Sequence, residues 1–202
     1  MKNTIVLLLI MLLIACKSEK KESSTTPSTN EVKTNNNTLK SGDYSSLLID
    51  FTCDIKISEL AQVLEIPETD LSFSDNPVAN KCTFNLAGFG INNIGENTRL
   101  IWGPSPSSKG QNKKEISSYL KRKKEGLKIM GMDIELDETG DCYIAYQPAH
   151  GRVIILNEHY DQMFLIHYGQ KNANNNRTKE QHEALLPKMV DLANYLLTKH
   201  RK

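Results

Sequence analysis

Residues 132–168, MDIELDETGDCYIAYQPAHGRVIILNEHYDQMFLIHY, contain the pattern that decides the fold. Four stretches rich in apolar and β-prone residues are separated by short polar turns, a pattern typical of neighbouring strands. Connections this short join antiparallel neighbours. The sequence therefore predicts a four-strand antiparallel meander, with strands at 132–137, 141–147, 152–156 and 162–168.

Two further strands are expected upstream of the meander. The alternation of residues 81–86 predicts one of them, and residues 98–102 predict the other. We expect Gly103 and Pro104 to end the second strand, because proline cannot donate a ladder hydrogen bond.

Three helices complete the expected pattern. The first follows Ser58 as N-cap and stops before Pro67. The second, over residues 112–125, is opened by the capping-box pair Asn112 and Glu115 and followed by Gly126 as the C′ residue. The last begins at the capping box Thr178-x-x-Gln181, and Pro187 should kink or restart it.

The apolar pattern of the chain after its N-terminal region begins at residues 47–51. The expected order of elements is strand, helix, two strands, helix, four strands, helix. This order predicts an α+β fold: a single antiparallel sheet with a C-terminal four-strand meander and two or three helices packed on it.

The N-terminus has the pattern of an export signal. After Lys2, an almost unbroken apolar run covers residues 4–15 and stops at Cys16, which a charged segment follows. This run is too short for the ~20 residues of a membrane-spanning helix and has the length of a secretory h-region. A plain cleaved signal with an incidental cysteine is the alternative.

Leu13-Ile14-Ala15-Cys16 resembles the lipobox of bacterial lipoproteins. The resemblance implies that the signal peptide, residues 1–15, is cleaved and that the Cys16 thiol carries a diacylglycerol. Two or three acyl chains at one residue anchor a protein stably to a bilayer. Lys17, in place of an aspartate, implies the outer membrane by resemblance to known sorting rules, either periplasmic or surface-facing.

Residues 16–42 are expected to be the lipidated cysteine and a tether, because their Ser, Thr and Asn tracts have little to bury. As a flexible coil this tether would span roughly 25–30 Å. Residues 43–202 form the expected globular domain. The chain holds 25 basic and 24 acidic residues, a net charge of +1, so no global field steers it toward nucleic acid.

The expected domain also resembles small PsbP/Mog1-like lipoproteins of the cell envelope over residues 50–198. The motifs that carry this resemblance are Cys53-Asp54-x6-Ala61-x2-Leu64 and Cys82-Thr83-Phe84. The resemblance implies a binding or assembly role and carries over no catalytic residue.

Three cysteines follow Cys16. The expected compartment is oxidising, so a disulfide is the default, and one thiol is left over. We expect Cys53 to pair with Cys82, because Cys142 lies inside a predicted strand. Three free thiols are the alternative, and the role of Cys142 stays open.

Other candidate sites favour structural interpretations. His150, His159 and His167 lack metal-ligand spacing, so no metal or cofactor is expected. Glu135 and Asp137 share a predicted strand face, as solvent-facing carboxylates often do.

The glycine-rich stretch 88–95 lacks the Lys-Ser/Thr ending of a phosphate loop. The lysine-rich helix 112–125 lacks interleaved aromatics, which favours a solvated face over nucleic acid and leaves contact with anionic lipid headgroups open.

The sequence thus predicts a membrane-anchored, non-catalytic binding or assembly module with a protein or glycan partner. An envelope inhibitor or immunity protein against a secreted toxin is the alternative. An envelope hydrolase would have to use Glu135, Asp137, His150 or His167.

Overall fold

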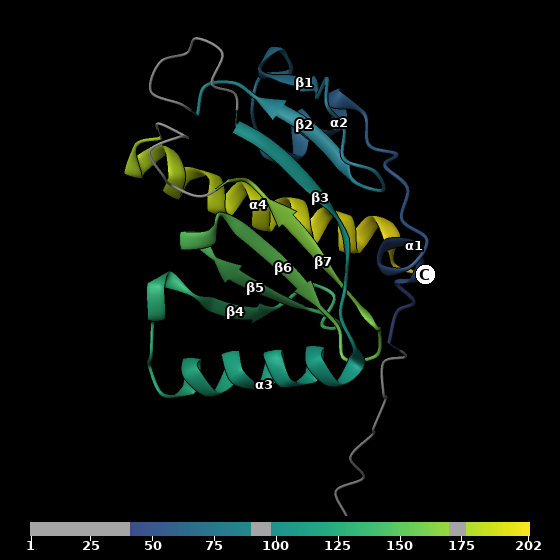
Figure 1. Cartoon of the computed structure of the whole chain (residues 1–202), viewed down its shortest axis with the longest axis vertical. Helices are drawn as coiled ribbons and strands as arrows, with labels where there is room; N and C mark the ends of the chain where they lie inside the picture. Colours follow the sequence, from purple (N-terminus) through teal and green to yellow (C-terminus); the bar gives the residue numbers. More distant parts are fainter. Residues whose placement is uncertain (1–40, 90–97, 170–176) are drawn as a thin grey trace, which may run out of the picture. The chain divides into compact units, whose positions relative to one another are not determined.

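Seven strands form one antiparallel sheet in the order β1-β2-β3-β7-β6-β5-β4 (Figure 1). The strands are β1 (Leu71–Phe73), β2 (Cys82–Leu86), β3 (Thr98–Pro106), β4 (Asp133–Leu136), β5 (Tyr143–Gln147), β6 (Arg152–Leu156) and β7 (Gln162–His167). Consecutive strands β4 to β7 lie side by side, so the predicted meander is confirmed. Strand β3 joins the meander by pairing with β7.

The computed structural model describes residues 41–89, 98–169 and 177–202. The predicted signal peptide 1–15, Cys16 and the predicted tether up to residue 40 lie outside these residues. Most of the glycine-rich stretch 88–95 also lies outside them.

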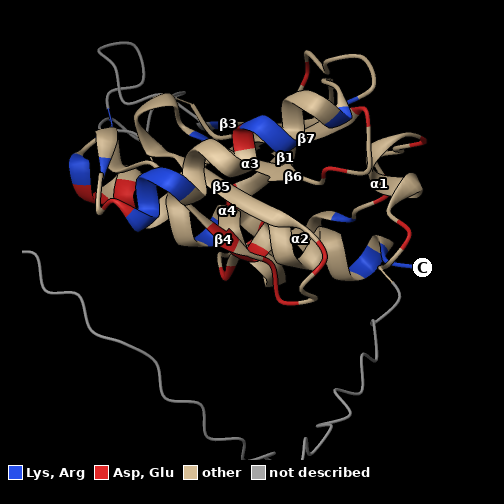
Figure 2. Ribbon diagram, turned by 90° about the horizontal axis from the view of Figure 1, so that it is seen from below, with Lys and Arg blue, Asp and Glu red and all other residues tan. Residues whose placement is uncertain are grey.

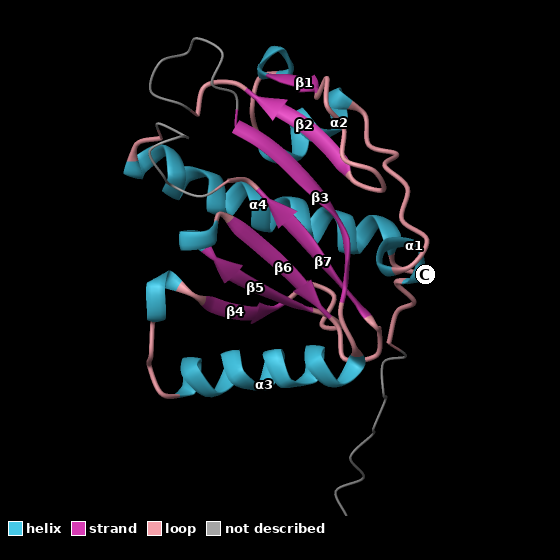
Figure 3. Cartoon of the chain, viewed as in Figure 1, coloured by secondary structure: helices cyan, strands magenta, loops and turns pink. Residues whose placement is uncertain are grey.

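Four α-helices accompany the sheet in the described part of the chain (Figure 3). They are α1 (Ser45–Leu48), α2 (Ile57–Leu64), α3 (Lys109–Lys124) and α4 (Lys179–His200). Short 3-10 turns lie at η1 (Glu68–Asp70), η2 (Ile129–Gly131) and η3 (Pro148–His150). The predicted α+β class, a single antiparallel sheet with helices packed on it, is confirmed. Within the described ranges, no helix has the length and apolar character needed to cross a bilayer.

Helices cover both faces of the sheet. On one face, α1, α2 and α4 enclose the larger core, which includes Trp102, Ile155 and Phe164. On the other face, Ile116 and Tyr119 of α3 pack on a smaller cluster. That cluster contains Ile134, Ala145, Ile154 and Leu156 of β4, β5 and β6. Because α3 covers only β4 to β7, the same face of β2 and β3 is left without a helix among the described residues.

The strand expected before the first helix, where the apolar pattern begins at residues 47–51, is not present. Residues 45–48 form the short helix α1, and no strand occurs between residues 41 and 56, all of which are described. Leu47 and Leu48 are both fully buried although they are adjacent, which a single strand facing one core could not achieve. The first strand is instead β1, only three residues long and paired with β2.

Strand β3 continues past Gly103 and Pro104, where we expected it to end. Its pairing with β2 stops at Trp102, and from there to Pro106 it pairs with β7 alone. The amide and carbonyl of one strand residue point to the same side, and the Pro104 carbonyl accepts a hydrogen bond from Lys81 Nζ. The missing N–H of Pro104 therefore faces the open side, where no ladder bond is lost.

Helix boundaries follow their side-chain caps. The predicted caps Thr178 with Gln181 and Gly126 are confirmed, and α4 runs through Pro187 without a restart. The N-cap of α3 is Ser108, four residues before the expected N-cap Asn112, because Ser108 Oγ accepts the Gln111 N–H at 3.1 Å.

Two expected N-caps lie inside their helices instead. Asn112 is buried in α3 and donates to the carbonyls of Asn157, Tyr160 and Gln162 at 2.9–3.1 Å, which fixes the β6–β7 turn. Ser58 lies within α2, whose N-cap is Lys56.

The predicted disulfide Cys53–Cys82 is present, with a Cα–Cα distance of 5.2 Å and a sequence separation of 29 residues. It joins the segment before α2 to the start of β2. Closing a loop of this length stabilises a fold by about 3.5 kcal/mol in the chain-entropy model.

Replacing both residues, Cys53→Ala with Cys82→Ala, should lower the free energy of unfolding by about 3.5 kcal/mol, because the unfolded chain regains the entropy of the open loop. Urea unfolding under oxidising conditions measures the change. The two proteins should become nearly equal in a reductant; a difference that persists there would assign the effect to packing instead of the crosslink.

Candidate functional site

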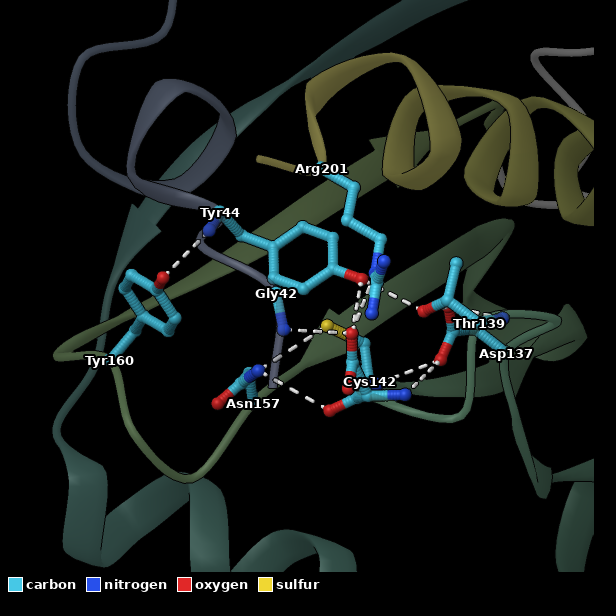
Figure 4. Close-up of polar contacts among 9 residues, drawn as sticks. Gly42, Tyr44, Asp137, Thr139, Cys142, Asn157, Tyr160 and Arg201 are labelled. Carbon is cyan, nitrogen blue, oxygen red and sulfur yellow. Dashed lines mark hydrogen bonds and ion pairs between the residues drawn. The ribbon is translucent and has the colours of Figure 1, made fainter. Parts of the chain in front are cut away.

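A polar cluster holds both ends of the domain against the β4–β5 turn (Figure 4). Its centre is Oδ2 of Asp141, which accepts hydrogen bonds from the Gly42 N–H at 3.0 Å and the Tyr44 hydroxyl at 3.0 Å. Arg201 Nε donates to the same oxygen at 2.9 Å. The backbone of Asp43 exchanges two hydrogen bonds with that of Lys202, at 2.9 and 3.0 Å. We call these residues, Gly42 to Tyr44, Asp141, Arg201 and Lys202, the terminal clamp.

The turn that carries Asp141 is fixed by Asp137. Its Oδ1 accepts the N–H groups of Asp141 at 3.0 Å and Cys142 at 2.7 Å. Its Oδ2 accepts the N–H and the hydroxyl of Thr139 at 3.1 and 2.5 Å. The structure thus places Asp137, one of the two carboxylates considered for hydrolysis, in a buried turn where both of its oxygens already have donors.

Glu135, the other carboxylate, is exposed on β4. It lies beside Tyr146, whose pKa is raised by burial and then by the hydrogen bond and charge of Glu135. Glu135 and Asp137 therefore have separate surroundings and separate partners.

The terminal clamp depends on the ionised form of Asp141. Burial alone would raise the pKa of this carboxyl, but hydrogen bonds from Arg201, Gly42 and Tyr44 outweigh it and lower the pKa below its ordinary value of 3.8. Burial raises the pKa of Tyr44 to about 12, so its hydroxyl remains a donor at neutral pH. At neutral pH the carboxylate is thus ionised and holds the two chain segments together through three donors on Oδ2.

Gly42 is required by the close approach of Arg201. A Cβ at this position would lie 2.7 Å from Arg201 Cγ, 2.8 Å from Arg201 Nε and 3.0 Å from Asp141 Oδ2. Any larger residue would therefore displace the guanidinium from the carboxylate.

Cys142 is a buried free thiol next to the terminal clamp. Burial raises its pKa to about 12, and the charges of Asp137 and Asp141 act in the same direction. Asn157 Nδ2 donates to its sulfur at 3.4 Å, which lowers the pKa by less. Since the thiolate is the reactive form, this environment disfavours a nucleophilic or redox role at neutral pH.

The three histidines considered for metal binding lie on separate elements. His150 belongs to η3, His159 is exposed in the β6–β7 turn, and His167 is at the end of β7. Burial and then the charges of Arg152 and Arg177 lower the pKa of His167. Among the described residues, no group of three His, Cys, Asp or Glu side chains could hold a metal ion.

A row of cross-strand partners crosses the face that α3 only half covers. Register places Thr83 opposite Ile101, Ile101 opposite His167, and His167 opposite Arg152. Asn85 and Arg99 pair on the same face, two residues further along β2 and β3. Ile101, His167, Arg152 and Asn85 are partly exposed, and Arg99 is exposed. We call these five residues the open half-face. Its donors and one apolar side chain could contact carbonyl-rich or acidic groups of a partner.

Sequence reasoning missed the terminal clamp and the open half-face, apart from His167. The terminal clamp joins Asp141 to Gly42, which is 99 positions away in the sequence, and to Arg201, which is 60 positions away. The open half-face depends on the order of the strands in the sheet. Neither has a local pattern. Cys16 lies outside the described residues.

A scan against protein-family models, a search of curated proteins and a search of solved structures each found no match. The resemblances to lipoproteins and to PsbP/Mog1-like domains therefore stay predictions.

Asp141→Asn should lower the free energy of unfolding at neutral pH by about 1–2 kcal/mol, because it weakens charge-assisted hydrogen bonds. The folded-state pKa of Asp141 is lowered, so its stabilisation is complete above pH 3.8 and is lost as the pH falls through the folded-state pKa. The difference between the two proteins should therefore shrink in acid. Urea unfolding across pH measures this, with the exposed Asp191→Asn as control; a difference that is constant with pH would contradict it.

Gly42→Ala should lower the free energy of unfolding, because the new methyl group would lie 2.7 Å from Arg201 Cγ and separate Arg201 from Asp141. Gly110→Ala in α3 is the matched control. Its Cβ would meet nothing within 4 Å, so a gain of about 0.5–1 kcal/mol is expected there from helix propensity. Both substitutions lower the conformational entropy of the unfolded chain by a similar amount. Equal effects in urea unfolding would show that the close approach at Gly42 is unimportant.

Proposed function

We propose that this chain is a lipoprotein of the bacterial envelope, anchored at the outer membrane through Cys16, whose domain is a non-catalytic binding or assembly module. The observation that carries the proposal is the apolar run of residues 4–15 that ends in Leu13-Ile14-Ala15-Cys16. Such a run directs export and then presents a thiol for lipid attachment.

Two features of the domain support an anchored, exported protein. The Cys53–Cys82 disulfide suits an oxidising compartment, where such bonds persist. The terminal clamp fixes the point at which the chain from Cys16 enters the domain, through Gly42 and Tyr44. The domain would thus be tied firmly at its point of attachment.

The open half-face is the surface we assign to a protein or glycan partner. Arg99 and Arg152 provide planar donors that suit carboxylate and carbonyl oxygens. One nitrogen of each already donates within the chain, to Asn76 O and to Gln147 Oε1. Ile101 lies two residues after Arg99 on β3. A surface of this kind binds through hydrogen bonds and shape and needs no reactive group.

The lipid anchor is tested by mass spectrometry of the mature protein purified from membranes. The expected product begins at Cys16, carries a diacylglycerol with or without an N-acyl chain, and contains one disulfide and one free thiol. Cys16→Ala is the control and should yield no lipid mass. An unmodified Cys16, or a mature N-terminus elsewhere, would contradict the anchor.

The binding surface is tested in the same cells by photocrosslinking. A photoreactive residue at Asn85 or Arg99 should give a discrete crosslinked product, whereas one at exposed Ser117 on α3 should not. Digestion of the product with protease or glycosidase separates a protein partner from a glycan. Products from Ser117 alone, or from none of the three sites, would contradict the assignment of the open half-face.

A further inference from the structure

The end of α3 and the turn after it form the most exposed continuous part of the described chain. Every residue from Lys123 to Gly131 is exposed. Leu127 and Ile129 are each 49% exposed, and Met130 is 62% exposed. We call residues 121–131 the basic corner, because five of its side chains are cationic and one is acidic.

The backbone of the basic corner is well defined although its side chains are exposed. The Gly126 N–H bonds to Lys123 O at 3.1 Å and the Leu127 N–H to Arg122 O at 2.9 Å, the pattern of a Schellman C-cap. In this motif the residue after the glycine usually packs against the helix, yet Leu127 remains half in solvent.

A second turn presents Met130 at its tip. Met130 and Gly131 both have left-handed backbone angles, with φ of 52° and 72°, and the Met132 N–H bonds to Ile129 O at 2.9 Å. This is the geometry of a type I′ turn, whose first central position ordinarily holds Asn, Asp or Gly. Met130 is thus held in an unfavourable backbone conformation, and its apolar side chain is exposed.

The cations of the basic corner are only partly neutralised. Lys121 pairs with Glu125 at 4.0 Å, and Lys123 pairs with Asp133 at 3.0 Å. Within the described part of the chain, the side chains of Lys124 and Lys128 make no ion pair within 4 Å and no hydrogen bond, although the charge of Lys128 helps to lower the pKa of Asp133. Figure 2 shows Lys and Arg gathered along the C-terminal part of α3 and the turn that follows.

The basic corner is a surface and not a small-molecule site. The pocket between α3 and β4 is only about 50 Å³ and is lined by Tyr119, Arg122, Lys128 and Asp133, among others. Pockets that enclose a small-molecule ligand are ordinarily about 300–1,000 Å³. This pocket is therefore too small to enclose such a ligand.

We propose that the basic corner docks on an anionic bilayer surface, with Leu127, Ile129 and Met130 inserted at the level of the headgroups and Lys124 and Lys128 against lipid phosphates. Exposed apolar side chains flanked by lysines are the combination that such an interface accepts, since it is apolar on one side and negatively charged on the other.

The position of the basic corner suits a protein already held at that bilayer, and in this respect the inference rests on the proposed function. The chain from Cys16 to Ser41 could span at most about 80–90 Å. That is several times the length of helix α3, which is about 24 Å for its 16 residues. Docking would turn a protein tied at one point into one with a fixed orientation.

The test places a tryptophan in the corner and measures its contact with lipid. Met130→Trp, and independently Ile129→Trp, are made in the full protein and mixed with phosphatidylcholine vesicles with or without phosphatidylglycerol. The lipids are brominated in the upper acyl chain and quench nearby tryptophan emission. Trp102, 1% exposed, supplies a constant background. Phe73→Trp is the matched control, because Phe73 is also exposed, at 59%, and lies on β1 at the other edge of the sheet.

We expect quenching at positions 129 and 130 on anionic vesicles, little on neutral ones, and none at position 73. Lys124→Gln with Lys128→Gln should weaken docking about 30-fold, which corresponds to about 2 kcal/mol for two cations near an anionic surface. Lys109→Gln with Lys114→Gln, at the other end of α3, should leave it unchanged. The proposal would be overturned by an absence of quenching at positions 129 and 130, which would point to a partner protein instead. It would also be overturned by equal quenching at position 73, or by unchanged docking when Lys124 and Lys128 are replaced.

The lipid mass at Cys16 is measured on the same preparations. An unlipidated protein whose corner is still quenched would contradict the anchor and support the docking. A lipidated protein on anionic vesicles with an unquenched corner would support the anchor and refute the docking.

Discussion

The constraint on which the structure depends is a strand that is apolar on both sides. Val153 and Ile155 of β6 face one core, Ile154 and Leu156 face the other, and all four are buried. A one-sided sheet would leave two of these side chains in water, at a cost of roughly 1.5–3 kcal/mol each. The strand therefore requires a helical layer on each face. Helix α3 is the lesser of the two layers, because it reaches the sheet mainly through Ile116 and Tyr119. The rest of the surface of α3 is rich in lysine side chains.

The helices and strands that could be predicted from the sequence are those whose signals lie within a short segment. The meander followed from short turns between apolar stretches, and the start of α4 from the reciprocal bonds of Thr178 and Gln181. Prediction failed where tertiary contacts overrode local preference. Leu47 and Leu48 are helical, which lets both adjacent side chains be buried. Asn112 was expected to cap α3 but lies in its interior. The insertion of β3 beside β7 could not be read from any segment, because strand order depends on the whole chain.

Candidate sites were predictable to a smaller extent. The pairing of Cys53 with Cys82 followed from elimination among three thiols, and the density of lysines on α3 was evident. The terminal clamp was not, because its partners are far apart in sequence and none has an unusual residue type. Nor was the exposure of Leu127, Ile129 and Met130, since an apolar cluster after a helix ordinarily indicates core. A buried cluster and an exposed one have the same sequence pattern, and only the absence of a facing layer among the described residues distinguishes them.

The backbone pairing of Asp43 with Lys202 brings the two ends of the described fold to one place. A domain whose ends are adjacent can be inserted into a surface loop of another protein, because the two insertion points in that loop can then lie close together. The same adjacency permits circular permutation, in which a short peptide joins residues 43 and 202 and new ends are cut elsewhere. The sheet order would survive such a change, since the segment through Asp43 contributes no strand to it.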